Sequence, residues 1–236
     1  NYAYGGAQTG SADDNSDPPS AAAQIQAFAS THSGFEPSDL ITLWIGGNDF
    51  LANPESPLPA ETLRSQYLDI LQGLVDLGAT NILWSLVPNY GLLPSYYGTE
   101  NQAPATAYAE SVNQAIHEVK ETIEIQNDGI RIVTFDFPML QAQLQESYAA
   151  YQLLDPPSVQ TEDTEDSTVL EQAFLMPDGV HPTATGHQII AANALQIMES
   201  SLATSLRPAD LRIAVAQDPI DADRRQFSLE ASGEGR

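Results

Sequence analysis

The sequence contains no cysteine and very few basic residues. It has 8 Lys and Arg against 32 Asp and Glu, which gives a formal net charge of -24, and Lys120 is its single lysine. Without cysteine there are no disulfide bonds and no cysteine-ligated zinc sites. Such an acidic surface repels nucleic-acid phosphates and anionic headgroups, so we expect no nucleic-acid partner. The charge suits a saline or extracellular setting, and we expect a secreted or cell-surface protein.

Long apolar runs are also missing. No stretch of about 18 consecutive apolar residues occurs, so we expect no transmembrane segment. The hydrophobic share of 42% is nevertheless sufficient for a sizeable core. We predict one large domain over residues 1–206, and a linker or the start of a β-type C-terminal module over 207–236. The second prediction rests on two segments of alternating polarity, 211–215 and 226–230.

Apolar segments and helical patterns alternate along the chain. Nearly continuous apolar runs predict buried strands over 40–45, 81–87 and 130–135. Apolar residues at helical spacing predict helices over 21–30, 60–77, 103–126, 141–151 and 184–202. This alternation predicts an α/β fold, with a parallel sheet covered by helices on both faces.

Residues 155–171 interrupt this order. The segment is rich in Asp, Glu, Ser and Thr and lacks an apolar period, so it predicts an exposed insertion. Its acidic run, 162–166, also suggests a calcium loop. However, it lacks the glycine and the alternating ligand spacing of such loops, so we favour a solvated insertion. The four histidines of the chain stand apart from one another, and we predict no metal site.

The segment 177–183, Pro-Asp-Gly-Val-His-Pro-Thr, places Asp178 three residues before His181. A turn closed by Gly179 and Pro182 can bring both side chains together. The histidine then serves as a general base, and the aspartate orients it and stabilises its charge. The alternative is a purely structural turn that starts the following helix.

Two glycine turns offer hydrogen-bond donors. Asn48 follows a predicted strand and two glycines, and ligands bind beyond the carboxyl ends of parallel strands. Its neutral amide can donate to an oxyanion, although an asparagine there can also be a helix N-cap. We interpret Asp49 as a structural capping residue. Gly5 and Gly6 form a second turn whose backbone N–H can donate. With the Asp–His segment, these residues predict an acyl-transfer site.

Three of these segments resemble the GDSL, or SGNH, lipases and esterases. The sequence NYAYGGA resembles the glycine block of that family, IGGNDF the asparagine block, and MPDGVHPTATGH the Asp-x-x-His block. The resemblance extends from Asn1 to Leu202. The segment VPNYGLLPSYYG resembles a loop of some secreted esterases of the family. Its Tyr90, Leu92 and Tyr96 either line an acyl chain or pack on the core.

The resemblance implies a fold and a set of roles. The fold would be a three-layer α/β/α sandwich of the flavodoxin-like SGNH type. His181 would be the general base and Asp178 its partner, while Asn48 and Gly5 or Gly6 would form the oxyanion hole. The substrate would be a small-molecule ester or lipid, and no cofactor would be required.

The sequence departs from the family in its nucleophile. No Gly-Asp-Ser occurs in it, and in the family this block precedes the glycine block. We therefore expect an N-terminally incomplete domain of a serine-type carboxylic ester hydrolase, a lipase or esterase acting through an acyl-enzyme, with its serine upstream of Asn1. This chain alone would be inactive. The alternative is a non-catalytic acyl- or glycan-binding relative without the serine. Glycan deacetylases and thioesterases also belong to the family.

Overall fold

A computed structural model describes residues 1–10, 16–161 and 166–202. It separates into one compact unit, Tyr2–Ala194, and another that consists of Asn1 and the residues from Leu195 onward. The first unit contains every candidate site residue. The predicted strands 211–215 and 226–230, the proposed boundary at 206 and most of the acidic run 162–166 lie outside the described residues.

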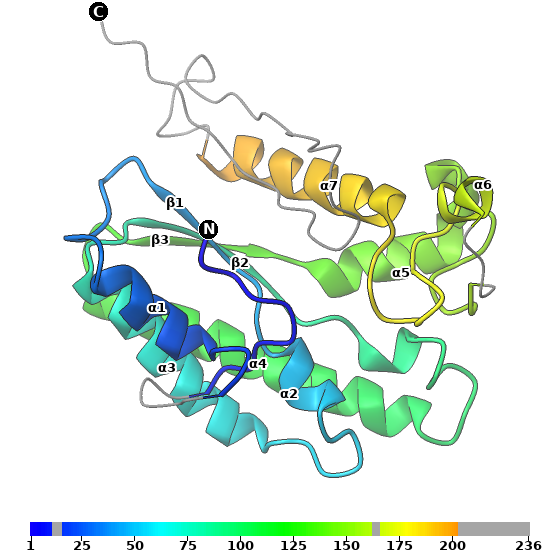
Figure 1. Cartoon of the computed structure of the whole chain (residues 1–236), viewed down its shortest axis with the longest axis horizontal. Helices are drawn as coiled ribbons and strands as arrows, with labels where there is room; N and C mark the ends of the chain where they lie inside the picture. Colours follow the sequence, from blue (N-terminus) through cyan, green and yellow to red (C-terminus); the bar gives the residue numbers. More distant parts are fainter. Residues whose placement is uncertain (11–15, 162–165, 203–236) are drawn as a thin grey trace, which may run out of the picture. The chain divides into compact units, whose positions relative to one another are not determined.

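The described sheet has three parallel strands, β1 (Leu40–Leu43), β2 (Asn81–Ser85) and β3 (Arg131–Phe135), in the order β1-β2-β3. The first residues of the three strands are paired with one another, so the carboxyl ends lie at the same edge of the sheet (Figure 1). The three strands and their parallel arrangement agree with the sequence prediction.

Burial differs between the strands. The central strand β2 is buried from Ile82 to Ser85, and the Trp84 ring meets the Tyr67 ring edge-on at 5.3 Å. The β1 strand is only half-buried: Thr42 is exposed, and the following Trp44 is 44% exposed. The prediction that all three strands are covered on both faces therefore holds for β2 and is wrong for β1. Within the described residues, β1 is an edge strand with one neighbour.

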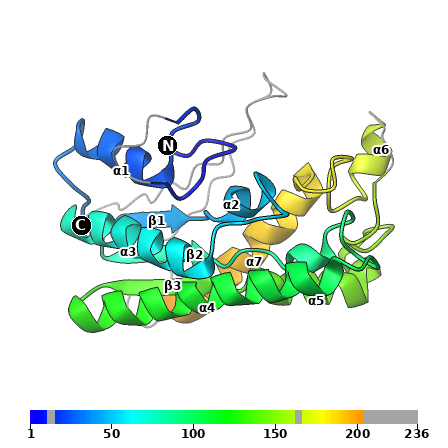
Figure 2. The ribbon, with the colours of Figure 1, turned by 90° about the horizontal axis from the view of Figure 1, so that it is seen from below.

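Helices α1 (Ala21–Ala29), α3 (Ala60–Asp76) and α4 (Gln102–Gln126) lie on one side of the sheet (Figures 1 and 2). The helical spacing predicted their buried faces; in α3 the buried residues are Leu63, Tyr67, Ile70, Leu71 and Leu74. Residues 184–194 of α7 (Ala184–Leu202) lie on the opposite side. No helix in the described ranges is long and apolar enough to cross a membrane.

The helix after β3 begins earlier than predicted. α5 spans Phe137–Ser147, and a 3-10 turn, η2, follows at Tyr148–Tyr151. The carboxylate of Asp136 accepts a hydrogen bond from the Met139 N–H at 2.9 Å and caps the helix. Apolar periodicity locates a helix face, but this start depends on a capping residue, Asp136, which directly follows the predicted strand 130–135.

The predicted insertion, 155–171, is not simply exposed. Pro157 and Ser158 are buried, and the Gln145 side chain donates to the Ser158 hydroxyl at 2.7 Å. A short helix, α6 (Ser167–Leu170), follows and is capped by the Asp166 carboxylate. The polar composition concealed this packing because its contacts are hydrogen bonds rather than apolar burial.

Candidate active site

The Asp–His turn, residues 177–183, closes a short antiparallel hairpin. Leu175 pairs with Pro182, and the Met176 N–H donates to the His181 carbonyl at 2.7 Å. The Gly179 N–H donates to the Met176 carbonyl at 2.9 Å, and Gly179 has a φ of 72°, a conformation that favours glycine. The chain thereby reverses direction between the aspartate and the histidine.

Within this turn, Asp178 and His181 form the Asp–His pair that the sequence predicts. The Nδ1 of His181 lies 2.8 Å from Oδ2 of Asp178. The other oxygen, Oδ1, accepts the backbone N–H groups of Val180 and His181, each at 2.9 Å. All three contacts hold the carboxylate in one orientation.

The charge on Asp178 determines which histidine nitrogen carries the proton. Partial burial by itself raises the pKa of Asp178, but the hydrogen bonds from the His181 and Val180 N–H groups and from the His181 ring outweigh it, and the pKa is lowered. An ionised carboxylate only accepts, so Nδ1 must donate to it. In the neutral ring the lone pair is then on Nε2, and the side chain is 74% exposed. This geometry suits a general base.

The turn is joined directly to α7. Thr183 is buried, and its hydroxyl accepts the Gly186 N–H at 3.0 Å while donating to the Ala173 carbonyl at 2.6 Å. A side chain at Gly186 would collide with the Phe174 carbonyl oxygen. The close approach of α7 to the segment around Phe174 therefore requires glycine at position 186.

The second turn, the Gly–Asn turn of Gly46, Gly47 and Asn48, leads from β1 into α2 (Gly47–Leu51). Gly46, with a φ of 109°, is the helix N-cap, so Asn48 does not have the capping role. Instead the Asn48 Nδ2 donates to the Ala7 carbonyl at 2.9 Å. Ala7 directly follows the turn of Gly5 and Gly6, so the structure brings the two glycine turns together.

Asp49 reinforces this junction. It is 3% exposed and accepts the Thr9 N–H at 3.1 Å and the Thr9 hydroxyl at 2.7 Å. Burial raises its pKa. The prediction of a structural residue is confirmed, but its partner belongs to the glycine-turn segment rather than to the end of its own helix.

Two tyrosine hydroxyls hold the Gly–Asn turn, a role that the sequence did not predict for either residue. The Tyr67 hydroxyl donates to the Ile45 carbonyl at 3.3 Å, and the Tyr90 hydroxyl donates to the Gly46 carbonyl at 3.2 Å. Both side chains are buried, and burial raises the pKa of each well above its usual range, so both remain donors. Helical spacing identified Tyr67 only as a core residue, because periodicity does not reveal where a hydroxyl points.

In the loop after β2, the three residues that were predicted either to line an acyl chain or to pack on the core differ in their exposure. Tyr90, in the 3-10 turn η1 (Tyr90–Leu92), is 1% exposed and stacks on Phe50 at 4.1 Å. Leu92 and Tyr96 are partly exposed. Packing therefore accounts for Tyr90, while Leu92 and Tyr96 have surface available to a ligand.

This loop also contacts both turns of the site. Tyr90 bonds the Gly46 carbonyl, and a Cβ added to Gly179 would lie 3.4 Å from Cγ of Pro94. Both turns thus contact one short segment. Among the described residues, no hydrogen bond joins His181 to Asn48, and no three His, Asp or Glu side chains gather as metal ligands.

Comparison with protein families decides the identity of the fold. The model of the GDSL-like lipase/acylhydrolase family matches residues 1–194. The chain belongs to this family. Membership implies the SGNH α/β hydrolase fold, in agreement with the parallel sheet and its helices. The match includes both glycine turns and the Asp–His turn.

A curated relative of this GDSL-like chain is a protein of Pseudomonas putida described as an "uncharacterized protein in trpE-trpG intergenic region". The two are 27% identical over 217 residues, which cover 85% of this chain and 36% of the relative. The chain thus spans about a third of the length of that relative.

Proposed function

We propose that this chain carries the base and oxyanion-binding parts of a serine-type carboxylic ester hydrolase that acts through an acyl-enzyme. The observation that carries the proposal is the hydrogen bond of 2.8 Å between His181 Nδ1 and an Asp178 carboxylate fixed by two backbone N–H groups. It leaves Nε2 as the basic nitrogen on an exposed ring. Family membership supports the same chemistry.

In the proposed reaction, Nε2 of His181 removes the proton of a serine hydroxyl while the serine oxygen attacks the ester carbonyl carbon. The protonated ring then transfers this proton to the departing alcohol, which leaves an acyl-serine. Water attacks the acyl-serine in turn and gives its proton to Nε2. Collapse releases the carboxylic acid and returns the proton to the serine, and Asp178 stabilises the charged ring in each half.

Asn48 is suited to stabilise the tetrahedral oxyanion. An amide NH₂ has two N–H donors, and one of them is directed at the Ala7 carbonyl at 2.9 Å. This bond fixes the side chain and leaves the second N–H for the substrate. A backbone N–H of Gly5 or Gly6 is the proposed second donor. Each donor contributes about 3–4 kcal/mol of transition-state stabilisation.

The proposed nucleophile is a serine on a strand upstream of Asn1 that pairs with the free edge of β1. Gly-Asp-Ser does not occur in the sequence, and within the described residues β1 has one neighbour. Thr42 in this strand and Trp44 just after it are exposed, and an added strand would reduce their exposure. The proposed substrate is a small-molecule ester or lipid whose acyl part contacts Leu92 and Tyr96. The acidic charge supports a proposed secreted or cell-surface location.

Labelling with a fluorophosphonate tests the nucleophile. The full-length protein should hydrolyse p-nitrophenyl esters and carry the label on an upstream serine, whereas the 236-residue chain should be inactive and prone to aggregate. A label on a serine within this chain would overturn the upstream location. Full-length protein that takes no label and hydrolyses no ester, yet binds fatty acids or acylated glycans, would favour the non-catalytic relative.

A further inference from the structure

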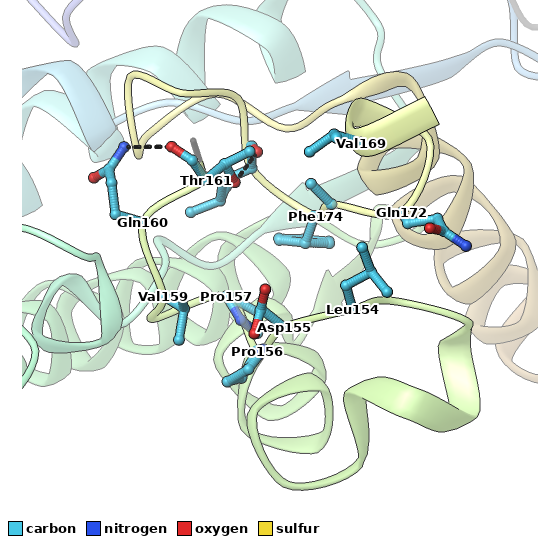
Figure 3. A pocket seen from close by; sticks show the side chains of 12 residues that line it. Leu154, Asp155, Pro156, Pro157, Val159, Gln160, Thr161, Val169, Gln172 and Phe174 are labelled. Carbon is cyan, nitrogen blue, oxygen red and sulfur yellow. Dashed lines mark hydrogen bonds between the residues drawn. The ribbon is translucent and has the colours of Figure 1, made fainter. Parts of the chain in front are cut away.

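A short segment before α6 holds the hairpin that carries the Asp–His pair. We name residues 157–161 the strap. The Thr161 hydroxyl donates to the Leu175 carbonyl at 2.8 Å (Figure 3). The Gln160 Nε2 donates to the Pro177 carbonyl. These carbonyls lie on either side of Met176, whose N–H donates to His181. The strap therefore bonds the hairpin strand that faces the histidine.

The opposite end of the strap is anchored to α5. The Gln145 amide donates to the Ser158 hydroxyl at 2.7 Å and accepts the Ser158 N–H at 3.3 Å. Ser158 is 6% exposed, and Pro157 beside it is also buried. Because α5 directly follows β3, the strap connects the Asp–His turn to the sheet.

Behind the strap lies a cavity of about 240 Å³. Its walls include Leu154, Val169 and Phe174 as well as four strap residues, Pro157, Val159, Gln160 and Thr161 (Figure 3). An engineered apolar cavity of about 150 Å³ in another protein admits benzene, so this one is large on the scale of a side chain. The strap therefore borders a pocket on this side, and its hydrogen bonds from Gln160 and Thr161 connect it to the hairpin.

We propose that Gln160 and Thr161 are positioning residues for the Asp–His pair. Neither is placed at the reacting atoms. By fixing the Leu175 and Pro177 carbonyls they hold the hairpin strand, and with it the direction of the bond from His181 Nδ1 to Asp178. This inference rests on the proposed function, in which that bond orients the general base.

Amide hydrogen exchange tests the strap without requiring activity. The Val180 and His181 N–H groups are protected by Asp178, and their exchange reports opening of the turn. Thr161→Val removes the hydroxyl at nearly constant volume, and we expect both amides to exchange roughly fivefold faster, as for the loss of one net hydrogen bond. Gln160→Leu should have a similar effect, and Thr161→Ser should restore protection.

Thr185→Val is the matched control. The Thr185 hydroxyl also donates to a carbonyl at 2.8 Å, but to Glu171, outside the hairpin. It should leave the Val180 and His181 amides unchanged. Unaltered exchange of these amides in Thr161→Val would overturn the proposal. An equal acceleration in Thr185→Val, or in the amides of β2, would also overturn it, because the effect would then be general loosening.

Kinetics of the full-length protein separate the two proposals. We expect Thr161→Val to lower kcat roughly fivefold with little change in KM, and Thr161→Ser to recover it. If the Val180 and His181 amides exchange faster in the strap variants but neither wild type nor any variant hydrolyses esters, the strap is shown to hold the turn and the proposed function is rejected. If esters are hydrolysed through His181 but the Val180 and His181 amides exchange at the wild-type rate in the strap variants, the proposed function is supported and the positioning role of the strap is rejected.

Discussion

The Gly–Asn turn and the Asp–His turn are built in opposite ways. The carbonyls of the first are held by buried hydroxyls from two other elements, Tyr67 of α3 and Tyr90 of η1. In the second, the side chains of Asp178 and His181 are 49% and 74% exposed, and their mutual contacts span only three residues of sequence. One turn belongs to the core, whereas the other is a surface hairpin.

This difference predicts how each turn tolerates change. A surface pair contributes little to stability, so substitutions there should affect chemistry far more than stability. Substitutions around the Gly–Asn turn leave buried polar groups without partners, which costs about 1–3 kcal/mol each. In that turn, loss of activity and loss of stability should occur together.

His181→Ala should give the largest kinetic effect. Without the base, kcat of the full-length protein should fall by roughly 10⁴-fold or more, while urea unfolding stays close to wild type because the side chain is exposed. His187→Ala, one turn into α7, is the control that should retain activity. Near-wild-type turnover in His181→Ala would rule out the assigned base.

Asn48→Ala should give the second-largest loss of kcat. Loss of an oxyanion donor lowers kcat by about 10²–10³ with little change in KM. The variant also leaves the Ala7 carbonyl without its bond, so stability should fall with activity. Steady-state kinetics and urea unfolding measure both effects. A change confined to KM would mean that Asn48 helps only to bind the ground state.

The same comparison explains what the sequence could reveal. Asp178 and His181 are three residues apart, so spacing alone was sufficient to predict their contact. Asn48 and Ala7 are far apart in sequence, and their approach follows only from the fold. Family resemblance predicted that they share a site, but it did not predict the hydrogen bond between them.

Other features of the structure could not be predicted from the local sequence pattern. Tyr67 occupies a helical apolar position, and its pattern is the same whether or not its hydroxyl holds a carbonyl. Thr161 lies in a polar stretch that predicts solvent exposure, yet its hydroxyl bonds the hairpin. The exposure of β1 likewise depends on strand order, which local apolarity does not determine.

Tyr90→Phe and Tyr67→Phe should lower kcat less than Asn48→Ala does. They test whether the two buried hydroxyls help to position Asn48. Each removes a buried donor from a carbonyl next to Asn48, so stability should fall by about 1–3 kcal/mol. A displaced Asn48 should lower kcat by up to about tenfold, equivalent to roughly 1.4 kcal/mol. Tyr108→Phe is the control, because its hydroxyl donates at 2.6 Å to Leu58, away from the turn. Equal kcat losses in all three variants would contradict a role of the Tyr67 and Tyr90 hydroxyls in positioning Asn48.

The smallest effect is a difference in how stability depends on pH. Burial raises the pKa of Asp49 above the ordinary aspartate value of 3.8, so the folded protein binds this proton more tightly than the unfolded chain. Stability from Asp49 is therefore greatest below that value and declines as the pH rises toward the folded pKa. In Asp178, burial opposes ionisation but its hydrogen bonds outweigh it and lower the pKa from 3.8, so its contribution is present above that value and is lost as the pH falls.

Asp49→Asn and Asp178→Asn should thus give opposite slopes in urea unfolding of the full-length protein between about pH 3 and pH 6. The stability of wild type relative to Asp49→Asn should fall with rising pH, because only wild type must ionise a buried group. Relative to Asp178→Asn it should rise, because only wild type gains the hydrogen-bonded carboxylate. Slopes of the same sign would mean that both carboxylates experience similar surroundings, and the distinction between a buried turn and a surface turn would fail.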